Sequence, residues 1–309
     1  MTSVIELQNV TKRYGKQIAL ADVSFAVPPG VVFALLGENG AGKSTAIRMM
    51  LGLADQSAGE VRVLDLDPRR DSLAIRRRVG YLSERPVFYE WMTAAEIGWF
   101  TAAFYPDGFE HQYRTLIAGF QVPLDRRLNQ MSKGMRAKVG LSLAMAHSPE
   151  LLILDEPTSG LDTLVRREFL ESMVDIAAAG RAVLLSSHQI GEVERVADIV
   201  AILHKGQLLV KEPLEELKRT TRQLNITVVE SSAPRPALDG VVIYERRQGR
   251  QWELLVRGLE DSDLERLRFA DGVVAVESRT PSLEEIFVAY IGKDSSAADL
   301  SPSAQIITR

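Results

Sequence analysis

The stretch from Gly37 to Ser44 reads Gly-Glu-Asn-Gly-Ala-Gly-Lys-Ser and decides the fold. It follows the continuous apolar run Val31–Leu36 and leads into a helical pattern that extends to about Leu53. A buried strand, a glycine-rich turn and a helix in this order bring backbone N–H groups and a helix N-terminus around phosphate oxygens. A chance glycine turn would lack these flanks, so the stretch predicts a phosphate-binding loop.

The side chains of this loop have separate predicted roles. Lys43 is expected to bridge the β- and γ-phosphates of a nucleoside triphosphate, and Ser44 to give a hydroxyl ligand to Mg²⁺. Thr45 is expected to add its backbone N–H and its hydroxyl to the α-phosphate. The loop residues that we predict to bind nucleotide are Gly37, Asn39, Gly40, Ala41, Gly42, Lys43, Ser44 and Thr45.

A second motif follows another apolar run, Leu151–Leu154. This run places Asp155 at the carboxyl end of a buried strand, where open α/β sheets bind ligands. Asp155 is expected to hold Mg²⁺, through water, and Glu156 to orient the attacking water. A lone Leu-Asp-Glu is usually a surface turn, but together with the phosphate loop it predicts a P-loop NTPase. No Asn-Lys-x-Asp follows, which disfavours a guanine-specific GTPase.

Three further features narrow the family. Met131–Met135 precedes a helical run, Ser159–Asp162 follows Glu156, and His188 follows the apolar strand Ala182–Ser186. Ser132 is a good helix N-cap, and a free helix N-terminus beside Gly134 is an anion site. Each feature alone has an ordinary structural explanation, and only the three together, in this order, favour a functional role.

In this order the motifs resemble those of the ABC ATPase family, over about Val4 to Lys218, and the segment Met131–Met135 matches what that family calls the signature motif. The resemblance implies binding of ATP and Mg²⁺ by a head-to-tail dimer, with each ATP held between one chain's phosphate loop and the other chain's signature. It makes Glu156, His188 and Lys43 catalytic, and Tyr14 a stacking partner of adenine, although a plain surface tyrosine is a rival interpretation. The residues expected to act on the other chain's nucleotide are Ser132, Gly134, Met135 and Asp162.

Two departures from the family pattern matter. Glu84 stands where the family usually has glutamine, and its carboxylate can approach Mg²⁺ or its waters but cannot donate a hydrogen bond. Lys133 and Met135 replace the more frequent glycine and glutamine of the signature. Such variants resemble bacterial export-type subunits, so we expect an exporter.

Composition excludes several classes of function. The chain has 309 residues, no cysteine and four scattered histidines, which excludes disulfides, thiolate catalysis and cysteine-ligated zinc. A net charge of −4 predicts no nucleic-acid partner. No run approaches the roughly 18 to 20 apolar residues that cross a bilayer. The resemblance therefore implies a separate polytopic membrane subunit, a second ATP-binding subunit (homo- or heterodimer) and a cytoplasmic location on the inner face of the plasma membrane.

The domain organisation follows from the strand and helix patterns. Residues 1–218 predict an α/β nucleotide-binding domain: N-terminal antiparallel strands, a parallel-containing core sheet and an inserted helical lobe at about 86–148. Its core strands are expected at Val61–Leu64, Gly80–Leu82, Leu151–Leu154 and Ala182–Ser186. Residues 219–292 predict a small α+β accessory domain, and the Ser/Ala/Asp-rich residues 293–309 a disordered tail.

Aromatic side chains gather in the sequence after Glu84. Trp99, Phe100 and Phe104 are expected in the core of the helical lobe, whereas Phe88, Tyr89 and Trp91 could line a groove for a helix of the membrane subunit. Two other functions of the chain remain as alternatives to a transporter subunit: a soluble ABC ATPase not tied to transport, and a non-catalytic protein that binds ATP as a switch. A single cassette without a heptad run argues against the first, and the presence of Glu156 and His188 against the second.

Overall fold

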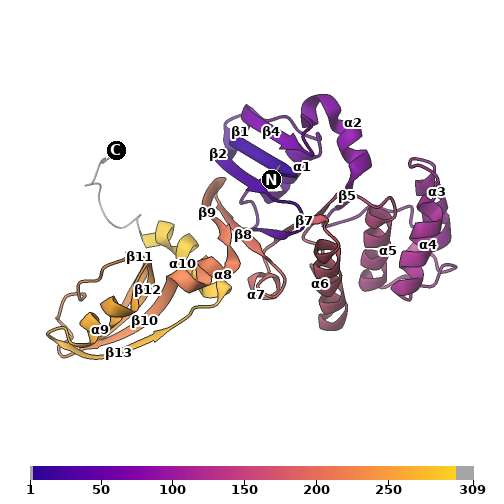
Figure 1. Ribbon diagram of the computed structural model, residues 1–309. Helices are drawn as coiled ribbons and strands as arrows, with labels where there is room; N and C mark the ends of the chain where they lie inside the picture. The colour runs from indigo at the N-terminus through magenta and orange to yellow at the C-terminus, as the bar shows by residue number, and fades with distance from the viewer. Residues whose placement is uncertain (1–2, 297–309) are drawn as a thin grey trace. The chain divides into compact units, whose positions relative to one another are not determined.

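The computed structural model describes residues 3–296, which fall into two compact units, Met1–Glu212 and Pro213–Arg309 (Figure 1). Helix α8 (Leu214–Thr220) therefore groups with the second unit, whereas the sequence placed the boundary at 218. Leu217 of this helix is fully buried. Helix α10 (Leu283–Ser296) runs past Lys293, and residues 297–309, predicted to be disordered, lie outside the described residues.

A six-stranded sheet forms the centre of the first unit, in the order β5-β6-β7-β3-β8-β9. Four pairs, β5–β6, β6–β7, β7–β3 and β3–β8, are parallel. Parallel strands buried on both faces are continuous apolar runs, and β3, β6 and β7 are buried at every position. The strands are β3 (Val32–Leu36), β5 (Val79–Leu82), β6 (Leu151–Asp155), β7 (Ala182–Ser187), β8 (Ile199–His204) and β9 (Gln207–Pro213).

A separate three-stranded antiparallel sheet has the order β2-β1-β4, with β1 (Ile5–Tyr14), β2 (Gln17–Val27) and β4 (Ala58–Val63). The N-terminal antiparallel strands are thus confirmed. The assignment of Val61–Leu64 to the core sheet was wrong, because β4 pairs with β1. Its Gly-Glu-Val-Arg-Val sequence alternates, so only Val61 and Val63 are buried, as expected for a strand with one face to solvent.

Helices complete the first unit. The helical lobe consists of α3, α4 and α5, and Tyr113 lies at its centre with its hydroxyl donating to the Ala94 carbonyl at 2.8 Å. A Cβ on Gly98 would lie 2.2 Å from the Tyr113 ring, so the ring needs this glycine. The helices are α1 (Lys43–Met50), α2 (Pro68–Arg78), α3 (Ala94–Ala102), α4 (Phe109–Gly119), α5 (Lys133–Met145), α6 (Thr163–Ala178) and α7 (Ile190–Val193), with a 3-10 turn at Leu128–Gln130.

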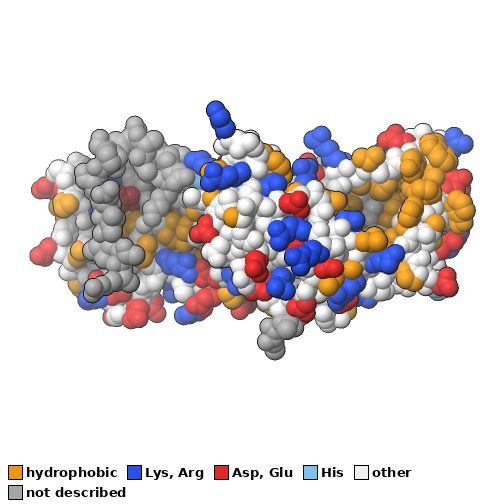
Figure 2. All heavy atoms as spheres, turned by 90° about the horizontal axis from the view of Figure 1, so that it is seen from above, with side chains coloured by type: hydrophobic (Ala, Val, Ile, Leu, Met, Phe, Trp, Pro, Cys, Tyr) orange, Lys and Arg blue, Asp and Glu red, His pale blue; other side chains and the backbone are white. Residues whose placement is uncertain are grey.

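Two of the three aromatic residues predicted for the lobe core lie at the surface instead. Trp99 and Phe104 are 66% and 65% exposed, and only Phe100 is partly buried against the core. The physical reason is that Tyr113, with its aliphatic neighbours on α4, already fills the space next to Gly98. Figure 2 shows hydrophobic side chains gathered at the end of the first unit that carries α3 and α4.

The second unit is a four-stranded antiparallel sheet in the order β11-β12-β10-β13, with α9 (Asp261–Arg268) and α10. Leu264 and Leu267 of α9 pack with Leu224, Ile226 and Leu254 of the sheet, so α9 covers one face. The strands are β10 (Thr221–Val228), β11 (Val241–Gln248), β12 (Gln251–Arg257) and β13 (Val273–Arg279). In residues 3–296 no helix combines the length and apolar composition needed to span a bilayer.

Candidate functional site

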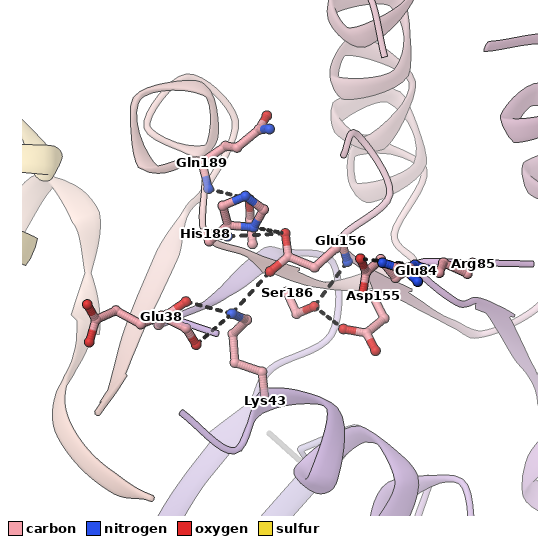
Figure 3. A network of polar contacts seen from close by, with 11 residues as sticks. Glu38, Lys43, Glu84, Arg85, Asp155, Glu156, Ser186, His188 and Gln189 are labelled. Atoms are coloured by element: carbon pink, nitrogen blue, oxygen red, sulfur yellow. Dashed lines mark hydrogen bonds and ion pairs between the residues drawn. The ribbon is translucent and has the colours of Figure 1, made fainter. Parts of the chain in front are cut away.

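The predicted site residues follow the carboxyl ends of neighbouring parallel strands. The phosphate loop follows β3, Asp155 ends β6 with Glu156 directly after it, and His188 follows β7. Since β7 lies between β3 and β6 and runs parallel to both, these groups meet at one edge of the sheet (Figure 3). The topology thus explains why motifs more than a hundred residues apart form one network.

The backbone of the loop requires glycine at several positions. Gly40 and Gly42 have φ values of 83° and 112°, which side chains rarely allow. A Cβ on Gly42 would lie 2.6 Å from the Leu20 side chain, and one on Gly37 would lie 2.5 Å from the Leu203 carbonyl oxygen. The loop is therefore fixed against β2 and β8, with its N–H groups before the first turn of α1.

Lys43 is the only lysine or arginine buried among the described residues, with 5% of its surface exposed. Its ammonium group donates to the Gly37 carbonyl at 2.5 Å and to the Glu38 carbonyl at 3.3 Å. It also forms an ion pair of 3.1 Å with Glu156 Oε1. A buried cation needs such partners because desolvation is costly. These three oxygen partners hold the ammonium group beside the phosphate loop.

Glu156 connects the lysine to the histidine. Its Oε2 lies 2.7 Å from His188 Nδ1 and accepts the His188 backbone N–H at 3.2 Å (Figure 3). The residue is 7% exposed and has a φ of 49°, an unusual value for a residue with a side chain. Such backbone strain persists where the surrounding structure holds it, and it often marks a functional position. The structure brings all three predicted catalytic residues into contact.

Ser186 is the residue that the sequence reasoning missed. Its hydroxyl donates to Asp155 Oδ1 at 2.5 Å and accepts the Glu156 backbone N–H at 3.2 Å. It stands opposite Asp155 in the parallel register of β6 and β7. A serine inside an apolar strand is a sequence feature that could have indicated this role, but only the pairing of β6 with β7 shows that the serine faces Asp155. Tyr81 on β5 is close enough to the site to be affected by its charge. Burial raises the pKa of the Tyr81 hydroxyl most, and the negative charge of Asp155 raises it further.

The carboxylates fit a magnesium ion that takes most of its ligands from water and nucleotide. Ser186 engages one oxygen of Asp155, which leaves the other for an ion or a bound water. Among residues 3–296 no cluster of three or more His, Cys, Asp or Glu could hold a metal by itself. Mg²⁺ usually binds one or two carboxylates, substrate phosphates and waters, so a site with the carboxylate of Asp155 is compatible with this ion.

The remaining predicted residues lie around this network or apart from it. Ser132 and Asp162 are N-caps of α5 and α6, and they accept the N–H groups of Met135 at 3.2 Å and Val165 at 3.0 Å. Tyr14, at the end of β1, is partly exposed under the Lys12 ammonium group. Glu84 lies past the end of β5, near Arg85 (Figure 3). Around the loop, Ala41 and Gly37 are buried, Gly42 and Thr45 are half-buried, and Asn39, Gly40 and Ser44 are exposed.

The signature end of α5 packs tightly against its own chain. A Cβ on Gly134 would lie 3.2 Å from a methyl group of Val165, and one on Gly160 would lie 2.3 Å from the Lys133 ammonium nitrogen. The Lys133 side chain thus lies over the segment that ends at Asp162. Ser132, Met135 and Asp162 are held there by local contacts, and their predicted partners are on another chain.

Comparisons with known proteins agree with this geometry. The family model described as "ABC transporter" matches residues 20–159. The chain is 34% identical to the bacitracin transport ATP-binding protein BcrA of Bacillus licheniformis, over 72% of this chain and 74% of that protein. It is 31% identical to the Nod factor export ATP-binding protein I of Sinorhizobium fredii, over 94% and 86%. A solved ATP-binding subunit of an ABC transporter aligns with 34% identity and a TM-score of 0.65, over 70% of this chain and 92% of that one.

Proposed function

The chain belongs to the family of ABC transporter ATP-binding proteins, and from this premise we propose that it hydrolyses ATP to drive an exporter whose membrane subunit is a separate chain. The name of one relative, a Nod factor export ATP-binding protein, supports the direction of transport. The observation that carries the proposal is the buried contact of Glu156 with both Lys43 and His188.

The proposed reaction begins when the nucleotide phosphates replace Glu156 as the partner of Lys43. The ammonium group then neutralises charge on the β- and γ-phosphates, and Glu156 Oε1 becomes free to accept a hydrogen bond from the attacking water. His188 holds Oε2, so the carboxylate keeps its orientation while its other oxygen positions the water. Water attacks the γ-phosphorus, the bond to the β-phosphate oxygen breaks, and ADP and phosphate leave.

We assign Mg²⁺ to Ser44 and Asp155, with Glu84 reaching the ion or its waters. The ion, when bound, neutralises charge on the phosphate oxygens. Asp155 is suited to this role because it is 6% exposed and Ser186 fixes its orientation. Tyr14 is proposed to stack on the adenine, since an exposed aromatic ring offers an apolar face to a base.

The active form in this proposal is a dimer. ABC ATP-binding subunits dimerise and work with membrane subunits, and here the first turn of α5, capped by Ser132, has N–H groups without an intrahelical partner. Ser132, Gly134 and Met135 of one copy would bind the γ-phosphate held by Lys43 of the other, and Asp162 would lie at the same interface. Loss of the γ-phosphate removes the link between copies, so hydrolysis opens the dimer.

A cavity of about 360 Å³ in the first unit is the proposed contact with the membrane subunit. It lies between the core sheet and the helical lobe, and Phe88, Val87 and Tyr105 line it. Tyr89 and Trp91 do not line this cavity; they lie at the surface, where Tyr89 contacts Phe100 edge-on at 5.4 Å between ring centroids. A cavity lined by the aromatic side chains of Phe88 and Tyr105 suits the binding of an amphipathic helix from a membrane subunit.

A substitution at the centre of the network tests the ATPase and the dimer together. Glu156→Gln keeps the size of the side chain but cannot polarise water, so ATP should be bound and not hydrolysed, and size-exclusion chromatography with MgATP should show a dimer. Glu171→Gln on the exposed face of α6 is the matched control and should remain monomeric after ATP turnover. A monomeric Glu156→Gln protein saturated with ATP would overturn the composite site.

The membrane partner needs its own test. Phe88→Asp should abolish co-purification of the chain with a multi-spanning membrane protein from detergent extracts and leave ATP binding unchanged. If no multi-spanning protein co-purifies with the wild-type chain, a soluble ATPase not tied to transport becomes the better description.

A further inference from the structure

The second unit contains a cavity of about 360 Å³ that is lined by residues of its sheet and of α10. This volume is within the range of small-molecule sites. The cavity lies on the sheet face away from α9, because Gln223, Leu255 and Tyr244 are cross-strand neighbours there. Glu253 and Arg246 form the next row. The residues of α10 that line it are Glu284, Glu285, Val288 and Ala289.

Gln223 gives the cavity a polar group without a partner. The side chain is 9% exposed, and its Nε2 donates to Glu253 Oε1 at 3.0 Å. Its Oε1 is buried and has no hydrogen-bond partner among the described residues. A carboxylate accepts and does not donate, so the amide nitrogen must face Glu253 and the orphan atom must be the oxygen. A buried unpaired acceptor is costly, which makes it a point where a donor would bind.

The surroundings define the donor. Glu253 adds a carboxylate beside the orphan oxygen, so the matching group is a cation with several N–H donors. Leu255 and Ala289 are buried, and Val288 on α10 is an exposed apolar residue at the cavity. These side chains form an apolar wall next to the polar pair. Arg279 already pairs with Glu285, so that carboxylate has its own cation.

We propose that this cavity binds a small molecule with a primary ammonium group on an apolar body. The ammonium group donates to Gln223 Oε1 and to the Glu253 carboxylate, and the body lies along Leu255, Val288 and Ala289. Two sources share this chemistry: a plain amine, and an amino acid whose carboxylate would meet Arg246. The site belongs to the second unit and does not depend on the nucleotide chemistry of the first.

Calorimetric titration of the full chain tests the chemistry with a matched series. Hexylammonium should bind at least tenfold more tightly than 1-hexanol or hexanoate, which share its body but lack the cation. L-norleucine separates the sources: tighter binding than hexylammonium that Arg246→Gln removes identifies an amino-acid site, and weaker binding identifies an amine site. No saturable binding of hexylammonium or norleucine, or equal binding of 1-hexanol, would overturn the proposal.

Variants locate the site. Gln223→Met keeps the length of the side chain without its acceptor and should weaken hexylammonium binding about tenfold or more, the usual effect of losing a hydrogen bond to a charged group. Glu253→Gln keeps a partner for Gln223 and removes the charge, so it should weaken binding similarly even if Gln223→Met unfolds the unit. Glu265→Gln makes the same charge change on α9, on the opposite face, and should leave binding unchanged. Equal weakening by Glu265→Gln would count against this location.

Discussion

Charged side chains are buried at the phosphate-loop edge of the first unit, whereas those of the second unit's sheet lie nearer the surface. Lys43, Asp155 and Glu156 are each less than a tenth exposed; Lys43 pairs with Glu156, and Asp155 accepts a hydrogen bond from Ser186. In the second unit the Arg279–Glu285 pair is partly open to water, with side chains 54% and 38% exposed. Removing one member of a buried pair is costly, and an exposed pair contributes little. Ion pairs of similar residue types are thus expected to contribute differently to the stability of the two units.

The largest expected effect comes from leaving Glu156 without its cation. Lys43→Met should lower the local stability of the nucleotide-free first unit by about 3 to 5 kcal/mol, since a buried carboxylate loses its counter-charge, and should abolish ATP hydrolysis. Hydrogen exchange of the β3 and β6 amides measures the stability without assuming one transition for two units. Lys43→Met/Glu156→Gln should regain much of the loss. A double variant no more stable than Lys43→Met would contradict the contrast between the units.

Ser186 sharpens the same contrast, because it positions Asp155 without touching the nucleotide itself. Ser186→Ala should lower the ATPase rate at saturating ATP by about 10- to 100-fold, as for other partners of metal ligands, and should raise the Mg²⁺ concentration needed for half-maximal rate. Ser187→Ala is the control, since its equally buried hydroxyl accepts the Gln189 backbone N–H. Equal rates for the two variants would remove Ser186 from the site.

The nucleotide edge could be predicted from sequence because its motifs are local. A glycine-rich loop, a carboxylate after an apolar strand and a histidine after another strand each depend on a few adjacent residues, and the parallel sheet brings them together. Ser186 escaped prediction because its role depends on the register of β6 against β7. Trp99 and Phe104 were wrongly predicted to be buried because Tyr113, on another helix, fills the core of the lobe, and this packing cannot be read from the local sequence.

The second unit shows the opposite limit. The sequence predicted a small α+β domain at residues 219–292, and the structure has four strands with α9 and α10 between Thr221 and Ser296, since alternation and helical periodicity are also local signals. Its cavity was not predicted, because Gln223, Glu253 and the α10 residues meet only through antiparallel pairing and helix docking. No motif links these residues along the chain. Long-range packing therefore separates what sequence patterns specify from what they leave open.

Substitutions of Ser132, the N-cap of α5, should have an effect of intermediate size. They distinguish its role in helix stability from its proposed role in ATP hydrolysis. Ser132→Ala should reduce the hydrogen-exchange protection of the first turns of α5 by about 1 kcal/mol, the usual value of an N-cap. Ser132→Asp restores a capping acceptor, so protection should return, but its negative charge should repel the γ-phosphate of the other copy and keep the ATPase rate low. Full activity of Ser132→Asp would show that Ser132 acts only as a cap.

The smallest expected effect concerns the surface pair of the second unit. Hydrogen bonds from Arg279, with help from Ser282, lower the pKa of Glu285 to about 2, from an ordinary value of 4.5. A lowered folded-state pKa contributes stability that is complete above pH 4.5 and is lost as the pH falls toward 2. Because the pair is partly exposed, Glu285→Gln should cost α10 less than about 1 kcal/mol of exchange protection at pH 7. The difference from wild type should shrink between pH 4.5 and pH 2, whereas Glu284→Gln, one residue earlier on the helix, should show neither effect. A cost as large as that of Lys43→Met would mean that the pair acts as a buried one, and the contrast between the two units would not hold.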